Sequence, residues 1–315
     1  MTVAFNTPIL LLVFNRPETT AVVLKKLSEI RPKDLFVVSD GPRKNNSADV
    51  ELCERVKGMI DLVDWPCTVH KNYSETNLGC RNRVSSGISW FFDNVEQGII
   101  LEDDCVPDIS FFPYCEELLL KFKDDDRIGH IGGTNPISEL CDGKYNIYYS
   151  KHNNIWGWAS WRRAWKDYDV DMRHWPEIRE TEMFAQLFSR KQDKLQWYRA
   201  FDQVYRKELD TWDYQWTFAC WLSGRLSVLP RRNLVSNIGF GVGATHTSNT
   251  FNGFANLKVF PFTFPIKYPP WLLRDYQCDK KREIKESIDS NRLLLLIRRL
   301  ASIVFSLANR CTFRN

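Results

Sequence analysis

Short apolar runs alternate with amphipathic segments in the first third of the chain, and this alternation constrains the fold most. Strands fit Pro8–Phe14, Asp34–Asp40, Cys67–Asn72 and Gly98–Leu101, and the first, second and fourth of these are almost unbroken apolar runs, as in strands buried on both faces. Helical spacing falls between them, over Thr19–Ile30, Ser47–Leu62 and Cys80–Asn94. The pattern predicts an α/β fold, with a mostly parallel sheet and helices on both faces.

Polar residues follow three of these strands directly. They are Asn15-Arg16, Ser39-Asp40 and Glu102-Asp103-Asp104. In open parallel sheets, ligands bind outside the carboxyl ends of the strands. If the three strands are neighbours, these side chains gather at a single site.

The acidic triplet Glu102-Asp103-Asp104 indicates a cation site. Three adjacent carboxylates repel one another and raise one another's pKa. A divalent cation relieves that repulsion, and carboxylate oxygens suit Mg²⁺ or Mn²⁺, which commonly bridge protein carboxylates to substrate phosphates. A solvated acidic turn is the alternative interpretation. The buried strand just before the triplet favours the functional one.

Composition excludes several other classes of protein. The 315 residues carry a net charge of +4 without a long basic stripe, so a nucleic-acid partner is not expected. Nine cysteines lack CxxC pairs, which argues against a disulfide framework or a zinc ribbon and favours a cytoplasmic protein. The first residues lack the pattern of a signal peptide, so no export is expected.

The second half of the chain is patterned more loosely. We expect helices over Phe111–Phe122, Glu180–Leu209 and Asp210–Ser223, and strands over Ile128–Asn135 and Leu226–Pro230. A glycine-rich loop, Asn237–Thr247, precedes a Pro- and aromatic-rich stretch. The predicted organisation is a main domain over 1–250, divided at 105 into a nucleotide-binding half and an acceptor half. An irregular extension over 251–290 and a basic amphipathic helix over 291–315 follow.

Five motifs resemble those of a known family. They are Val13-Phe14-Asn15-Arg16-Pro17, Val38-Ser39-Asp40-Gly41, Asn77-Leu78-Gly79, Leu101-Glu102-Asp103-Asp104 and the late His246. Over roughly residues 8 to 250 the chain resembles the GT-A nucleotide-diphospho-sugar glycosyltransferases, most closely the bacterial inverting family 2-like enzymes. The resemblance implies a Rossmann-like sheet, and transfer of a sugar from a nucleotide-diphosphate donor to an acceptor hydroxyl with Mn²⁺ or Mg²⁺.

The resemblance also implies roles for individual residues. Asn15, Arg16 and Pro17 would contact the nucleotide, and Asp40 would read the base or ribose. Asp104 would touch the metal, while Glu102 and Asp103 would contact sugar and ribose. A late histidine often completes the metal shell in this fold, which maps to His246 in its glycine-rich loop.

Two further charged residues are candidates for the chemistry. Arg81 stands in the first turn of a predicted helix, and both the helix N-terminus and the guanidinium favour a diphosphate. The alternative is an exposed arginine in a plain turn. An inverting transferase needs a general base, and Asp213 resembles the family's acid near the acceptor. Asp210 is its rival, and it also suits the N-cap of the helix that follows.

The Trp-rich segment 156–165 is a candidate acceptor surface. Trp156 and Trp158 flank Gly157, and flat indole rings suit sugar faces. The same rings would equally suit a packed core, because Trp161 and Trp165 have helical spacing.

Residues 291–310 combine an apolar helical stripe with Arg292, Arg298, Arg299 and Arg310. This pattern suits a helix lying on an anionic membrane, and it suits an enzyme on the inner face of the plasma membrane that acts on a glycan or lipid-linked acceptor. Docking on the protein itself, or an oligomer contact, is the alternative. A retaining transferase of the same fold is a further alternative, because the acidic motif does not fix the stereochemistry. Two other functions compete: a sugar nucleotidylyltransferase, and a non-catalytic, membrane-associated sugar-binding protein. The turn Asn15-Arg16-Pro17 lacks the glycine-rich pattern of the former.

Overall fold

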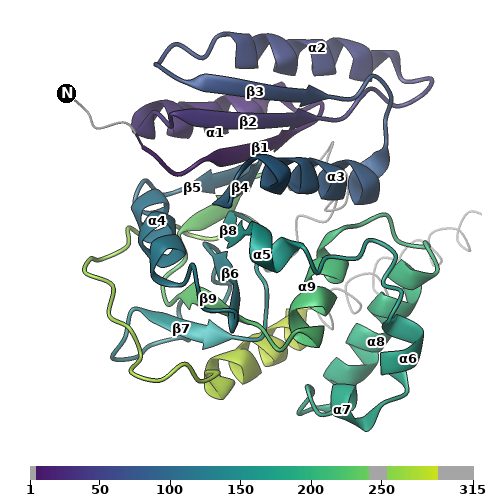
Figure 1. Ribbon diagram of the computed structural model, residues 1–315, viewed down its shortest axis with the longest axis vertical. Coiled ribbons are helices and arrows are strands. Elements are labelled where there is room, and N and C mark those ends of the chain that lie inside the picture. The colour runs from purple at the N-terminus through teal and green to yellow at the C-terminus, as the bar shows by residue number, and fades with distance from the viewer. Residues whose placement is uncertain (1–4, 241–253, 290–315) are drawn as a thin grey trace, which may run out of the picture.

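The computed structural model describes residues 5–240 and 254–289, and an eight-stranded sheet runs through it (Figure 1). The strand order is β3-β2-β1-β4-β8-β6-β9-β7. The strands are β1 (Ile9–Val13), β2 (Asp34–Ser39), β3 (Thr68–Tyr73), β4 (Gln97–Glu102), β6 (Ile128–Gly132), β7 (Ile147–Ser150), β8 (Trp158–Trp161) and β9 (Leu226–Pro230). β7 and β8 run antiparallel to their neighbours, and the other pairs are parallel. A second, two-stranded sheet pairs β5 (Cys105–Pro107) with β10 (Val235–Asn237).

Helices cover both faces of the large sheet. One face packs against α1 (Pro17–Ile30), α2 (Ser47–Asp61) and α4 (Phe111–Lys121), and the other against α3 (Gly79–Asn94), α5 (Arg162–Trp165) and α9 (Asp213–Leu222). The alternation of side chains along a strand explains the two cores: Ile9 and Leu11 of β1 join the first, and Leu10 joins the second. The predicted fold class, an α/β Rossmann-like sheet with helices on both faces, is confirmed.

A separate aromatic cluster joins α6 (Trp175–Arg179), α7 (Glu182–Ala185) and α8 (Lys191–Tyr205) to α9. The sequence predicted one helical stretch over Glu180–Leu209, and the structure breaks it at residues 186–190. The break lets Phe184 of α7 and Phe201 of α8 both pack against Phe218 of α9.

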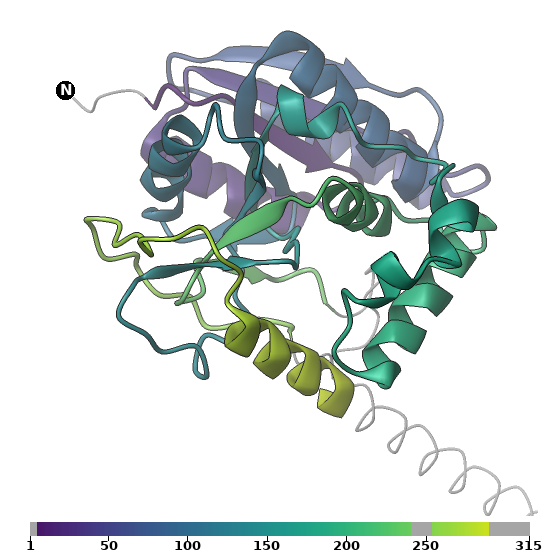
Figure 2. The ribbon, with the colours of Figure 1, turned by 60° about the horizontal axis from the view of Figure 1, so that its bottom comes forward.

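The prediction of irregular structure over 251–290 is wrong for residues 276–289, which form a helix along the lower edge of the molecule (Figure 2). Residues 260–270 are irregular, as predicted. Helical spacing was hidden in 276–289 because its buried face is polar: Asp279 is 1% and Glu283 3% exposed. The predicted helix over 291–315 lies outside the described residues.

In the part of the chain that the structure describes, no helix is long and apolar enough to cross a bilayer. Eight of the cysteines lie in that part, and all eight are free thiols, six of them buried.

Candidate functional site

The carboxyl ends of β2, β1 and β4 lie side by side, because these strands are parallel neighbours. Arg16, three residues after β1, reaches the acidic turn after β4. Its guanidinium contacts Asp103 (Nη2 to Oδ1, 2.5 Å) and Asp104 (Nη1 to Oδ2, 2.7 Å). The backbone N–H of Phe14 also donates to Asp103. The predicted convergence of the first and third polar groups is confirmed.

Asp104 is held from three directions. Besides Arg16, the side-chain amide of Asn237 donates to its Oδ1 at 3.2 Å, and the backbone N–H of Ile238 donates to its carbonyl at 2.9 Å. Gly239 lies so close that a Cβ there would be 2.0 Å from Asp104 Oδ2 and 2.7 Å from Arg16 Nη1. Sequence reasoning missed Asn237 and Gly239, since nothing in the pattern shows that β10 would pair beside the acidic turn.

The acidic turn carries more negative charge than Arg16 balances. Burial, followed by the charge of Asp104, raises the pKa of Glu102 to about 8, although Arg16 opposes this. Burial likewise raises the pKa of Asp103 to about 7 against the influence of Arg16. One oxygen of Glu102 is buried without a hydrogen-bond partner among the described residues. The site therefore holds protonatable carboxyl groups near neutral pH.

Asp213, the predicted base, starts α9 and lies near this turn. Its charge adds to the raised pKa of Glu102, after the larger effects of burial and Asp104. Thr211 donates a hydrogen bond to its carboxylate, and the hydroxyl of Tyr168 holds the carbonyl of Trp212 at 3.1 Å. The fold thus brings together Arg16, Glu102 and Asp213, which are far apart in sequence.

Asp40 and Asp210 share a different task, because together they cap α3. Asp40 accepts hydrogen bonds from the N–H groups of Leu78 and Gly79, and from that of Gly41. Asp210 accepts from the N–H groups of Cys80 and Arg81. The helix begins with four free N–H groups, and these two carboxylates take all four. Asp210 is therefore a helix cap, as suspected, but of α3 rather than α9.

This capping overturns the prediction that a diphosphate lies at the start of α3 with Arg81. The guanidinium of Arg81 is buried and donates to the carbonyls of Val170 (2.6 Å) and Val204 (3.2 Å) and to Asp171 (3.0 Å). Its role is to tie α3 to the aromatic helices. The predicted contact of Asp40 with a base or ribose would have to share a carboxylate that already caps α3.

The other predicted nucleotide contacts are anchored by the protein itself. The side-chain amide of Asn15 donates to Asp49 at 2.8 Å, and Asp49 in turn accepts three hydrogen bonds from Arg43. Hydrogen bonds from Arg43 lower the pKa of Asp49 to about 2. Pro17 is buried at the first position of α1, where its fixed φ starts the helix.

The two candidate tryptophans lie in different environments. Trp156 is half-buried, and its ring meets Phe240 edge-on at 5.5 Å. Trp158 is 0% exposed in β8 and packs among His130, Trp165, Trp212 and Trp216. The prediction that Trp158 touches an acceptor is therefore wrong, because β8 is a central strand and its inward ring belongs to the core.

The predicted metal ligands are Asp104 and His246. Within 5–240 and 254–289, no three His, Cys, Asp or Glu side chains come together as ligands. Asp104 uses its two oxygens for Arg16 and Asn237 instead. The second predicted ligand, His246, lies outside the described residues, so the Mn²⁺ or Mg²⁺ prediction stays untested.

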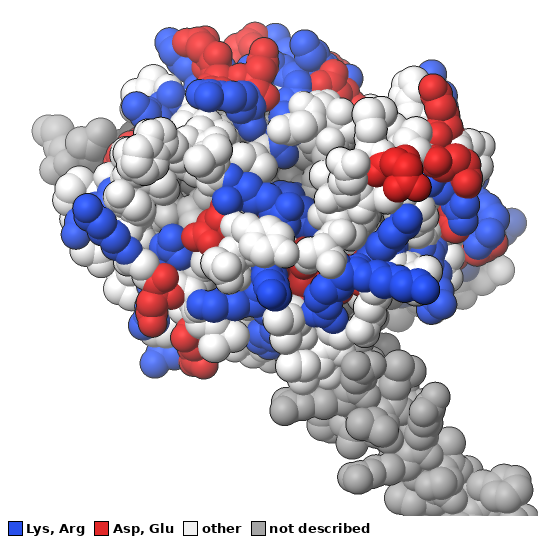
Figure 3. Space-filling model, turned by 90° about the horizontal axis from the view of Figure 1, so that it is seen from below, with Lys and Arg blue, Asp and Glu red and all other residues white. Residues whose placement is uncertain are grey.

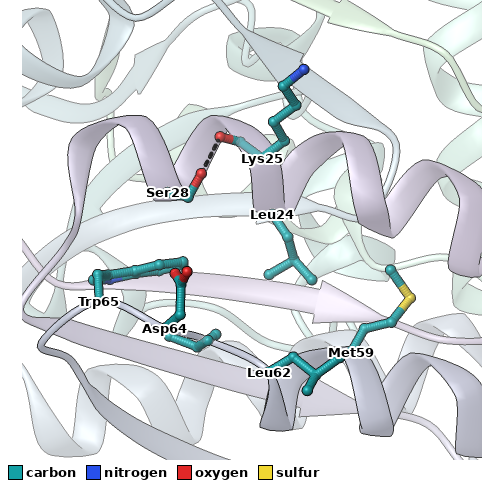
Figure 4. Close-up of a pocket in the computed structure, with 8 residues that line it drawn as sticks. Leu24, Lys25, Ser28, Met59, Leu62, Asp64 and Trp65 are labelled. Carbon is teal, nitrogen blue, oxygen red and sulfur yellow. Dashed lines mark hydrogen bonds between the residues drawn. The ribbon is translucent and has the colours of Figure 1, made fainter.

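One surface hollow is distant from this chemistry. It is lined by Leu24, Lys25 and Ser28 of α1, by Met59 of α2, and by residues 62–65 that follow α2 (Figure 4). These parts of the helices lie toward the amino ends of the strands, whereas the acidic turn is at the carboxyl ends. The hollow therefore plays no part in the site.

No protein-family model and no curated protein matches the chain. A UDP-glucose pyrophosphorylase complexed with UDP-glucose is 8% identical over 73% of this chain and 92% of that chain, with a TM-score of 0.38. The inositol-1-phosphate CTP transferase of T. maritima is 12% identical over 75% and 89%, with a TM-score of 0.37. The 4-diphosphocytidyl-2C-methyl-D-erythritol synthase of Anaerococcus prevotii is 11% identical over 62% and 84%, at 0.32. Similarity at this level assigns no function.

Proposed function

We propose that the chain is a glycosyltransferase that uses a nucleotide-diphosphate sugar. One observation carries the proposal: the fold gathers Arg16, the acidic turn Glu102–Asp104 and Asp213 at the carboxyl ends of parallel strands, where open α/β sheets bind ligands. In the proposal, Arg16 and the turn hold the donor, and Asp213 faces the acceptor.

The reaction is a displacement at the anomeric carbon. The acceptor oxygen forms a bond to that carbon, while the bond from the carbon to the diphosphate oxygen breaks and its electron pair leaves with the diphosphate. Asp213 takes the proton of the acceptor hydroxyl, which makes the oxygen a better nucleophile. Attack opposite the leaving group inverts the configuration. A glycan or a lipid-linked sugar is the proposed acceptor.

Nucleotidyl transfer is the competing reaction. It would use a nucleoside triphosphate and a sugar phosphate, and would release pyrophosphate. The short turn Phe14–Arg16 between β1 and α1 speaks against it, because this turn leaves little backbone to wrap a triphosphate.

The test is a binding and product assay on the whole protein. We expect UDP, GDP or CDP, or one of their sugars, to bind in calorimetry, and Asp104→Asn to weaken that binding at least about tenfold through loss of the paired carboxylate. Asp124→Asn, at a side chain 87% exposed, is the matched control. Repeating the titration with Mn²⁺, Mg²⁺ or chelator measures the metal dependence. Pyrophosphate release from a triphosphate would establish the competing reaction. If Asp104→Asn bound the nucleotides as the unaltered protein does, the acidic turn would not be the nucleotide-binding site.

A further inference from the structure

The helix over residues 276–289 is amphipathic in the opposite sense to an ordinary surface helix. Its inward positions include Asp279, Glu283 and Ser287, which are 1%, 3% and 7% exposed. Its outward positions include Ile284 and Ile288, which are 39% and 46% exposed. Surface helices normally place the apolar stripe inward and the polar residues outward. An exposed apolar stripe on an ordered helix therefore indicates a partner.

The inward polar face is fixed in place by ion pairs. Glu283 pairs with Lys151 at 2.8 Å and lies 3.3 Å from His152, and Asp279 accepts a hydrogen bond from Ser150 at 2.5 Å. These three partners follow one another at the end of β7. The helix cannot roll to bury its isoleucines without breaking these buried contacts, which makes the outward orientation of the apolar stripe a stable property of the fold.

The same pairing leaves the outer surface positive. All five acidic residues between 275 and 289 have a cationic partner within the protein: Asp275 with Arg231, Asp279 with Arg274, Glu283 with Lys151, Glu286 with Arg282 and Asp289 with Lys285. Lys280 and Lys281 are exposed, and Nζ of Lys281 donates to the carbonyl of Leu140 at 2.8 Å, so neither lysine forms an ion pair with these acids. Figure 3 shows Lys and Arg side chains gathered across this lower face.

The segment just before the helix extends the apolar surface. Trp271 and Leu273 are each 72% exposed, and Tyr276 is 44% exposed. The backbone beneath them is ordered, because Arg274 forms a β-bridge with Tyr149 of β7 and the N–H of Asp275 donates to the Tyr149 carbonyl at 2.7 Å. Large apolar side chains that are held outward in this way mark an interaction surface.

We propose that this outer face, formed by Trp271, Leu273, Tyr276, Lys280, Lys281, Ile284 and Ile288, docks on an anionic lipid surface. Tryptophan and tyrosine favour the interface between water and lipid, and lysines beside them attract anionic headgroups. The described residues end at 289, next to this face, and the sequence that follows is apolar and basic, with Arg292, Arg298, Arg299 and Arg310 and no acidic residue. The proposal does not depend on the proposed function.

A second copy of the chain fits this face less well. A twofold interface brings the same patch of both copies together. Two faces of the same positive charge would then meet, while the acids of the helix are already paired within each copy. An anionic lipid surface is complementary to both the positive charge and the apolar side chains of this face.

Flotation of the full chain with vesicles tests the proposal. We expect binding to phosphatidylcholine vesicles that contain phosphatidylglycerol, and little binding to phosphatidylcholine alone. Lys280→Glu with Lys281→Glu should weaken the binding about tenfold or more, because each basic residue near an anionic surface contributes to affinity. Ile284→Asn with Ile288→Asn, and Trp271→Ser, should each weaken it through lost apolar contact.

Two controls match these changes. Lys33→Glu with Lys44→Glu reverses two exposed lysines elsewhere, and Leu62→Asn removes a leucine that is 78% exposed near the amino ends of the strands. Both should bind vesicles as the unaltered protein does, and circular dichroism should show every variant folded. Equal vesicle binding by the face variants and the unaltered protein would overturn the proposal. So would a dimer in sedimentation that the face variants break, without vesicle binding.

Discussion

Arg16 Nη1 lies 2.7 Å from Asp104 Oδ2, although the two residues are 88 positions apart in the chain. The contact joins the turn after β1 to the turn after β4, and Arg16 reaches Asp103 through its other terminal nitrogen. Both aspartates are nearly inaccessible to solvent, at 1% and 5% exposed. A buried carboxylate pair without this guanidinium would be strongly unfavourable, so Arg16 supports the geometry of the site as well as its charge.

Arg16→Ala is expected to lower the free energy of unfolding by about 3 kcal/mol, because it leaves Asp103 and Asp104 buried without their cation. Arg16→Lys should recover part of this, since an ammonium cannot contact both carboxylates in the same fork. Urea unfolding measures both. As a control, Arg55→Ala breaks an exposed pair with Glu18 and should change stability by less than about 1 kcal/mol. Equal effects of Arg16→Ala and Arg55→Ala would contradict the assignment.

Gly239→Ala should disturb the acidic turn, because the added Cβ would meet Asp104 Oδ2 at 2.0 Å and Arg16 Nη1 at 2.7 Å. Nucleotide binding is expected to weaken, with a smaller loss of stability, and calorimetry reports the first. Gly58→Ala is the matched control. Nothing lies within 4 Å of its Cβ position, and a helix interior favours alanine over glycine by up to about 1 kcal/mol. Unchanged binding by Gly239→Ala would show that Gly239 does not lie against Asp104 and Arg16 when the nucleotide is bound.

Asp40→Ala and Asp210→Ala should each destabilise the protein by about 1 to 2 kcal/mol, since each removes hydrogen bonds to the N-terminal N–H groups of α3. Asn46→Ala, which removes the cap of α2, sets the scale for an ordinary cap. Chemical unfolding gives all three values. Asp210→Ala should also leave nucleotide affinity unchanged. A specific loss of affinity there would return Asp210 to the list of site residues.

Glu283→Gln should change how stability depends on acidity. Burial alone would raise the pKa of Glu283, but hydrogen bonds from His152 and Lys151 outweigh it and lower the pKa to about 2, below the ordinary 4.5. The ionised carboxylate therefore stabilises the fold above about pH 4.5, and this contribution is lost as the pH falls toward 2.

Urea midpoints measured across this pH range should fall steeply for the unaltered protein. At neutral pH the free energy of unfolding of Glu283→Gln should be lower by about 3 kcal/mol or more, because Lys151 loses its partner. The urea midpoints of this variant should also depend less on pH. Parallel pH profiles for the two proteins would show that the pair does not have this role.

Asp213→Asn should keep nucleotide-sugar binding and lose most transfer, because an amide cannot accept the acceptor proton. General-base catalysis typically contributes a factor of about 10² to 10⁴. Product formation and calorimetry on the same preparation separate the two effects. Asp124→Asn again serves as the control. Undiminished turnover would transfer the role of base to another group.

The sequence predicted the sheet and its helices well, because burial and periodicity act locally. The short unbroken apolar run Ile9–Val13 favours a strand buried on both faces, and Pro17 fixes where α1 begins. For the same reason Glu102–Asp104 could be placed at a strand end. Arg81 and Trp158 were assigned wrongly because their residue types suit both a ligand and a core, and only neighbours in space distinguish the two.

By itself, then, the sequence determined the α/β fold and the polar groups that follow β1, β2 and β4, since each depends on residues close together in the chain. The tertiary structure decided how those groups are used. It directs Asp40 and Asp210 to the N–H groups of α3 and places Arg16 between Asp103 and Asp104. It also turns the polar side of helix 276–289 inward, because Lys151 and His152 lie there and contact Glu283. Such pairings link positions far apart in sequence, and no local pattern encodes them.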